Sequence, residues 1–304
     1  MNIVYFILSS LCWGFAWYAV RIQGISDVPV AQTTGYRFFI VSLLIYLFCR
    51  IRKISATYTW RQHVSFAIQG LCLCSINFSL YCLAMKYIPS GLVSIGCATL
   101  VFMNAINSRL FLGMPISLQT ILGGSIGFIG MVLVFTPYLG SLQSMNDGML
   151  GLMYCLISTY ILSIGNTLAR YTNSGVSGNV LRNAVPMMFY GCIFSFIISF
   201  AQGESLKISF APEYIGALFY LVVFGSIIGL VSFLQLIQTI GSDKAAYAMM
   251  VSPVIALVVS SSLEGLNLTF ISVMGVVLVL AGCIVVLTKF NKKDTLNTHI
   301  KKAA

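Results

Sequence analysis

The chain has 304 residues and a mean hydropathy of +0.95, with 59% hydrophobic and only 8% charged residues. A soluble domain carries about 25% charged residues, so this composition excludes a water-exposed enzyme, and the same apolar excess excludes a disordered chain. The net charge of +10 does not indicate nucleic-acid binding, because the basic residues fall between apolar runs. The solvent that suits this composition is the lipid bilayer.

Apolar runs long enough to cross about 30 Å of hydrocarbon as helices follow one another along the chain. They cover residues 3–20, 30–49, 64–85, 89–111, 118–136, 149–169, 179–200, 213–236, 244–263 and 270–288. They are too long and too evenly apolar for strands, and the connections are too short for a soluble domain. The sequence therefore predicts an all-α membrane protein with ten transmembrane helices, the first of which is retained rather than cleaved as a signal.

The basic residues are unevenly divided between the two sides of the predicted membrane. Arg21, Lys86 and Lys207 fall on the side away from the N-terminus and Arg37 lies inside the second run, whereas the rest of the 17 Lys and Arg residues fall on the N-terminal side. Because Lys and Arg concentrate in cytoplasmic loops, this skew predicts that both termini are cytoplasmic. The basic tail, residues 289–304, is expected to anchor the topology or to contact anionic lipid.

The two halves of the chain resemble each other. Small residues recur with the same spacing, as Ser117, Gly123 and Gly130 in the first half and as Thr269, Gly275 and Gly282 in the second. The halves, residues 1–136 and 149–288, each hold five predicted spans. Because five is odd, the second half enters the membrane from the other side, so the repeat is predicted to be inverted. Inverted repeats allow two bundles to rock around a midplane site.

Several short motifs, taken in their order along the chain, resemble the EamA-type transporters of the drug/metabolite transporter superfamily. They are Trp13-Gly14, Pro29 followed by Arg37, Lys86-Tyr87-Ile88-Pro89-Ser90-Gly91, Leu110-Phe111-Leu112-Gly113, Ser252-Pro253 and the glycine pairs of the repeat. The resemblance implies a central cavity between spans 1–4 and 6–9, with spans 5 and 10 at the periphery, and export of amino acids or other small metabolites. The chain departs from the family at Met114-Pro115, where relatives often carry an acidic and a basic residue.

Arg37 is the most informative side chain, because it lies about seven residues inside the second span. A central Arg is costly in hydrocarbon unless it faces water or an anionic partner. Binding of a substrate anion therefore competes with two structural alternatives, snorkelling to the headgroups and a bond to a helix carbonyl. Glu264, at the end of the ninth span, is expected to be a loop carboxylate.

Other candidate substrate contacts are polar or aromatic residues inside the spans. The polar ones are Asn77, Thr99, Asn104, Asn166 and Ser252, for which hydrogen bonding between helices is the alternative. The aromatic ones are Trp13, Trp17 and Tyr81, whose rings suit an amphipathic solute but also pack between helices. Pro253 is expected to kink the ninth span, either at a binding site or as a tolerated irregularity.

The sequence predicts no catalytic residues, no metal site and no cofactor. Gly123-Gly124-Ser125-Ile126-Gly127 fits a nucleophile-elbow pattern but lies inside an apolar helix, and His63 and His299 lie outside the spans. No phosphate-binding glycine loop indicates ATP use. The partners expected are a small-molecule substrate and the bilayer, without nucleic acid, and the oligomeric state stays open.

Taken together, these features predict a secondary transporter of the inner or plasma membrane that works by alternating access. The substrate expected is a small amphipathic metabolite such as an amino acid, and export is favoured. The alternatives are import of a vitamin, nucleoside or other metabolite, and multidrug export. A membrane scaffold is disfavoured because it gains nothing from an inverted repeat, and a membrane enzyme because the spans lack His, Asp and Glu.

Overall fold

A computed structural model describes residues 2–54, 57–113, 116, 118–139, 142–173, 180–240 and 242–287. The predicted basic tail and Met114-Pro115 lie outside the described residues. The elements are α1 (Asn2–Gly24), α2 (Val30–Ile51), α3 (Trp60–Gly70), η1 (Leu71–Ile76), α4 (Asn77–Ala84), α5 (Ser90–Ala98), α6 (Leu100–Leu112), α7 (Leu118–Phe135), η2 (Thr136–Leu139), α8 (Leu142–Asn173), α9 (Val180–Ala201), α10 (Pro212–Tyr220), η3 (Leu221–Ile228), α11 (Gly229–Ile240), α12 (Ser242–Leu263) and α13 (Phe270–Leu287).

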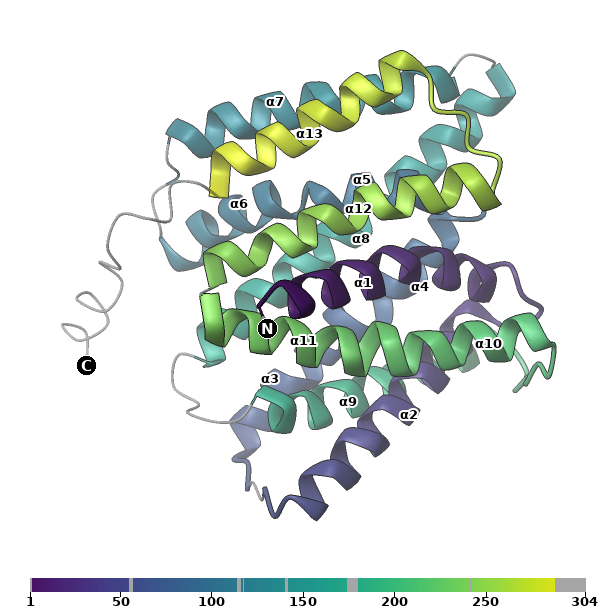
Figure 1. Ribbon diagram of the computed structural model, residues 1–304. Helices are drawn as coiled ribbons and strands as arrows, with labels where there is room; N and C mark the ends of the chain where they lie inside the picture. Colours follow the sequence, from purple (N-terminus) through teal and green to yellow (C-terminus); the bar gives the residue numbers. More distant parts are fainter. Residues whose placement is uncertain are drawn as a thin grey trace.

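These elements confirm the all-helical membrane fold. Eight stretches of the described residues have the length and hydropathy of membrane-spanning helices, and two shorter apolar helices, Ala248–Leu263 and Phe270–Val285, complete the predicted ten. The start of α1 and the end of α13 lie at the same end of the bundle, on the left in Figure 1. We call this end the N-terminal face and the other end the opposite face.

Three spans are less regular than the hydropathy pattern predicts. The third and eighth spans each contain a π-helical stretch, η1 and η3, whose first residues are 150 positions apart in the chain. The fourth span is divided into α5 and α6 at Thr99, whose hydroxyl donates to the Gly96 carbonyl over 2.6 Å. Hydropathy averages over a span and carries no signal for such local changes in hydrogen bonding.

The outermost helices, α7 and α13, cross through glycines. A Cβ on Gly130 would lie 2.6 Å from the Gly275 carbonyl oxygen, and a Cβ on Gly282 would lie 2.4 Å from that of Gly123. The lower-numbered glycine of each helix thus meets the higher-numbered glycine of the other, so the two helices run antiparallel. The repeat relates Gly123 to Gly275 and Gly130 to Gly282. Applying it to the contact between Gly123 and Gly282 therefore gives the contact between Gly275 and Gly130, as expected for an inverted repeat.

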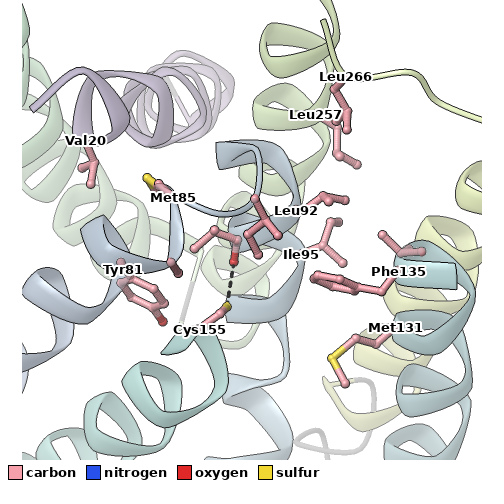
Figure 2. Packing of buried hydrophobic residues seen from close by; sticks show 14 of the residues in the cluster. Val20, Tyr81, Met85, Leu92, Ile95, Met131, Phe135, Cys155, Leu257 and Leu266 are labelled. Carbon is pink, nitrogen blue, oxygen red and sulfur yellow. Dashed lines mark hydrogen bonds between the residues drawn. The ribbon is translucent and has the colours of Figure 1, made fainter. Parts of the chain in front are cut away.

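The largest apolar core lies toward the opposite face. Figure 2 shows Ile95 of α5 facing Phe135 of α7, with Leu257 of α12 on the same side, while Met85 lies on the other side of α5 toward Val20 and Tyr81. The contact between α5 and α12 is close, because a Cβ on Gly91 would lie 2.9 Å from the Ser260 Cβ. On the N-terminal face, α6 packs mainly against α8 instead. The fourth and ninth spans are thus joined chiefly at the opposite face.

Candidate functional site

The centre of the bundle is organised around the two π-helical stretches. A π-helical turn widens the helix and loosens its backbone hydrogen bonding, and such turns are frequent at functional sites. In hydrocarbon, a backbone carbonyl released in this way needs another donor. A neighbouring helix supplies such a donor within η3, and another donates to the first carbonyl after η1.

Trp13 of α1 supplies the donor at η3, where its indole Nε1 donates to the Gly225 carbonyl over 3.1 Å. Ser158 of α8 plays the corresponding part beside η1, where its hydroxyl donates to the Asn77 carbonyl over 2.6 Å. Helices α1 and α8 are the first spans of the two halves. The half-buried Trp13 is therefore a structural support of the eighth span, and its ring packs 4.9 Å from that of Phe233.

Arg37 of α2 reaches the same π stretch. Its Nε and Nη2 both donate to the Ser226 hydroxyl, over 3.3 and 3.2 Å, and its guanidinium carbon lies 4.6 Å from the centre of the Phe78 ring and 5.1 Å from that of Phe38. Arg37 is only 7% exposed. The side chain is thus held inside the bundle, between α2, α4 and η3, so snorkelling to the headgroups does not describe it.

Aromatic rings fill the space beside Arg37. Trp17 packs edge-on against Tyr81 with 5.3 Å between ring centres, and Phe38 meets Phe78 at the same separation. The buried Tyr81 hydroxyl shares a 3.0 Å hydrogen bond with Thr159 of α8. The predicted residues Trp17 and Tyr81 therefore contact each other.

The predicted residues of this group form one central region. We call it the central cluster and define it as Trp13, Trp17, Arg37, Asn77, Phe78, Tyr81 and Ser226. Asn77 is 1% exposed, and its side-chain oxygen has no hydrogen-bond partner among the described residues. The cluster draws on α1, α2, α4 and η3, which belong to spans 1, 2, 3 and 8.

The other predicted residues lie outside the central cluster. Ser252 is buried on α12 next to Pro253, which lies inside the helix, and Asn166 is half-buried on α8. The side-chain oxygen of Asn104 on α6 is buried without a partner in the described part of the chain. Within the described residues, no hydrogen bond is seen between these three polar side chains and the central cluster, and Thr99 bonds to its own turn.

Glu264 lies in the connection just after α12, as expected of a loop carboxylate, but its side chain is only 2% exposed and lies 3.1 Å from Arg21 Nη1. One carboxylate oxygen accepts the Ser90 backbone N–H over 2.9 Å, and the other accepts the Ser90 hydroxyl. Arg21 also donates to the Met85 carbonyl over 3.2 Å. These contacts tie the ends of α1 and α12 to the start of α5.

A cavity of about 600 Å³ lies at the opposite face, between the first turn of α2 and the last turns of α4 and α9. Its wall carries the charged side chains Asp27, Lys86, Glu204 and Lys207. None of the nine predicted substrate contacts lines it. Among the described residues, no group of three His, Cys, Asp or Glu side chains is placed to hold a metal ion.

Sequence reasoning missed three parts of the site. Ser226 gave no signal, because a serine in an apolar span is common and its position in a π turn depends on backbone geometry. The Ser158 contact was missed for the same reason. Ser90 and Glu264 were both noticed, but they are 174 positions apart in the chain and nothing in the hydropathy pattern pairs them.

Comparison with known proteins places these features in a family. The profile of the EamA-like transporter family matches residues 1–136 and 149–288. The uncharacterized inner membrane transporter YedA of Escherichia coli K12 is 26% identical over 92% of this chain and 89% of its own length. Protein PagO of Salmonella typhimurium is 25% identical over 95% and 93%. A solved crystal structure, 14% identical, shares the fold with a TM-score of 0.66 over 96% of this chain and 99% of that one.

Proposed function

Because the chain belongs to the EamA-like transporter family, we propose that it is a secondary transporter that moves a small amphipathic metabolite by alternating access. An amino acid leaving the cytoplasm is the substrate and direction that we favour. The proposed activity breaks no covalent bond. Residues 1–136 and 149–288 would act as the two units that rock against each other.

The observation that carries this proposal is the unequal packing of the fourth and ninth spans. In an inverted repeat, these two spans have equivalent positions, so a fully symmetric bundle would join them equally at both faces. Here α5 packs closely against α12 at the opposite face, whereas α6 packs mainly against α8. In one end state of alternating access, the helices of the two halves keep their related positions, but the contacts between the halves are closer at one face than at the other. The packing of α5, α6 and α12 has this character.

The glycine crossing of α7 and α13 supports the same mechanism. Close backbone contact through small residues is a stable way to join helices in lipid. These two helices belong to different halves, so their crossing can hold the halves together while the inner spans change partners. The distribution of basic residues supports an orientation with the N-terminal face in the cytoplasm.

Flux into proteoliposomes tests the proposal. Purified protein is reconstituted, and counterflow of a panel of labelled amino acids and other small metabolites is measured with and without a pH gradient, against protein-free liposomes. Saturable flux of at least one solute is expected. If no solute in a broad panel crosses faster than in protein-free liposomes, the proposal is wrong.

Orientation has its own test. A reporter enzyme that is active only outside the cytoplasm is fused after residue 304, and a second is inserted near Gln202 in the connection after α9. The proposed orientation predicts an inactive reporter at the C-terminus and an active one at the α9 connection. Activity with the reverse pattern would overturn both the orientation and the inferred export direction.

A further inference from the structure

Arg37 is a buried cation without a counter-charge. The ion pair between Arg21 and Glu264 does not include Arg37, and no carboxylate pairs with Arg37 among the described residues. The groups around the guanidinium are the Ser226 hydroxyl and the rings of Phe38 and Phe78, all of which are neutral. A charge in such surroundings is costly unless an anion joins it for part of the time.

The hydrogen bonds of Arg37 are also incomplete. A guanidinium has five N–H donors arranged as a planar fork that matches a carboxylate. Here Nε and Nη2 share one oxygen atom, and Nη1 makes no hydrogen bond among the described residues. The Ser226 hydroxyl is a single neutral acceptor, so it cannot satisfy the fork. Arg37 therefore keeps donors for a further, anionic acceptor.

The surroundings suit a ligand that is anionic at one end and apolar elsewhere. Gly225 adjoins the guanidinium without a side chain, since a Cβ at that position would lie 3.9 Å from Nη2. The Phe78 ring faces the guanidinium itself, and the Phe38 ring lies beside it as well. Aromatic surfaces beside one charged group are a common arrangement for binding amphipathic small molecules.

We propose that Arg37 binds the carboxylate of the transported substrate, which is therefore a small amphipathic carboxylate rather than an amine or a neutral solute. The inference rests on the proposed transport function and adds the chemical class of the substrate. The carboxylate joins the fork of Arg37, and the apolar part of the molecule lies against the rings of Phe38 and Phe78. Ser226 positions the guanidinium for this contact.

Matched pairs of solutes and matched variants test the assignment. Phenylalanine and leucine are compared with phenylethylamine and isoamylamine, which lack only the carboxylate, in counterflow and in thermal-shift binding to purified protein. The variants are Arg37→Met, which removes the charge, and Arg37→Lys, which keeps the charge but not the fork. Arg50→Gln is the control, because Arg50 is exposed on the same helix.

With wild-type protein, the carboxylates are expected to be carried at least about tenfold faster than their amines. Arg37→Met should reduce carboxylate flux by a similar factor and abolish the thermal shift that carboxylates produce, while its own unfolding temperature is unchanged or higher. Arg37→Lys should raise KM more than it lowers kcat, and Arg50→Gln should behave as wild type. A purely structural Arg37 would instead lower the unfolding temperature when removed.

The two proposals fail in different ways. If wild-type protein carries amines as fast as carboxylates, or Arg37→Met carries carboxylates at the wild-type rate, the role of Arg37 is wrong and the transport function stands. If carboxylates shift the unfolding temperature of wild type but not of Arg37→Met, and nothing is carried, the site is correct and the transport function is wrong. If carboxylates are neither bound nor carried, the assignment of Arg37 is overturned.

Discussion

The guanidinium of Arg21 lies 3.1 Å from the carboxylate of Glu264, so the last turn of α1 is joined to the end of α12 at the opposite face. The same carboxylate accepts the backbone N–H of Ser90, the first residue of α5. Three spans that the alternating-access proposal requires to separate are thus held by one buried carboxylate. We call this group of Arg21, Glu264 and Ser90 the opposite-face latch.

Replacing Glu264 tests the latch. Glu264→Gln keeps the shape of the side chain but removes its charge, so Arg21 loses its anionic partner and Ser90 keeps at best one weaker acceptor. We expect a loss of about 1–3 kcal/mol in stability, since Arg21 is partly exposed and its charge is partly screened. The measurement is the unfolding temperature in detergent.

Glu213→Gln is the matched control for the latch. Glu213 is an exposed carboxylate in the first turn of α10, at the same face of the bundle. Its replacement should change the unfolding temperature little. Equal effects of the two substitutions would show that the contact between Arg21 and Glu264 does not stabilise the described conformation.

The close crossing of α7 and α13 predicts that a larger side chain at a crossing glycine destabilises the protein. Gly275→Ala would place a Cβ 2.6 Å from the Gly130 carbonyl oxygen and 2.7 Å from the Val134 nitrogen, and neither backbone atom can move without shifting a helix. We expect destabilisation of about 1–3 kcal/mol, because overpacking a close contact forces the backbone apart. The unfolding temperature of the purified variant measures it.

Gly216→Ala is the control for this crossing. Gly216 lies in α10, where an added Cβ would meet nothing within 4 Å. Ala is the better helix former, so this variant should be as stable as wild type or more stable by about 0.5–1 kcal/mol. A Gly275→Ala protein that matches Gly216→Ala in stability would contradict the close crossing.

The number and positions of the spans followed from the sequence because each span needs an apolar run of fixed length, and the bilayer imposes that length. Trp13 and Arg37 were found for a related reason, since a large ring or a charge inside such a run stands out. Their partners were not found, because Gly225 and Ser226 contribute through a π turn that hydropathy does not encode. The burial of Glu264 escaped prediction because it depends on a contact with a distant helix.

The structure also gives Trp13 a hydrogen bond that the sequence did not predict. Its position in the first span made it a candidate for substrate contact, and it belongs to the central cluster. Its indole N–H, however, is committed to the Gly225 carbonyl. A residue type can be picked out from sequence, but whether its polar atom is free depends on which backbone groups the neighbouring helix leaves open.

Ser158 offers a test of the support beside η1. Ser158→Ala removes the hydroxyl that donates to the Asn77 carbonyl and leaves that carbonyl with one contact fewer in a buried region. We expect a loss of about 1–2 kcal/mol, measured by thermal unfolding. Ser262→Ala is the control, because Ser262 is exposed and bonds only to its own helical turn. Indistinguishable unfolding of the two variants would argue against a supporting role for Ser158.

Trp13→Phe separates the hydrogen bond of Trp13 from its ring. Phenylalanine retains an aromatic surface against Phe233 but cannot donate to the Gly225 carbonyl, so the π turn beside Arg37 loses a support. Thermal stability should fall by about 1–2 kcal/mol. Flux should fall as well, because Ser226, the next residue of the turn, positions Arg37. Trp60→Phe is the control, since Trp60 is 79% exposed at the start of α3. If Trp13→Phe keeps its stability and loses flux only for aromatic solutes, the ring contacts substrate directly and the supporting role is wrong.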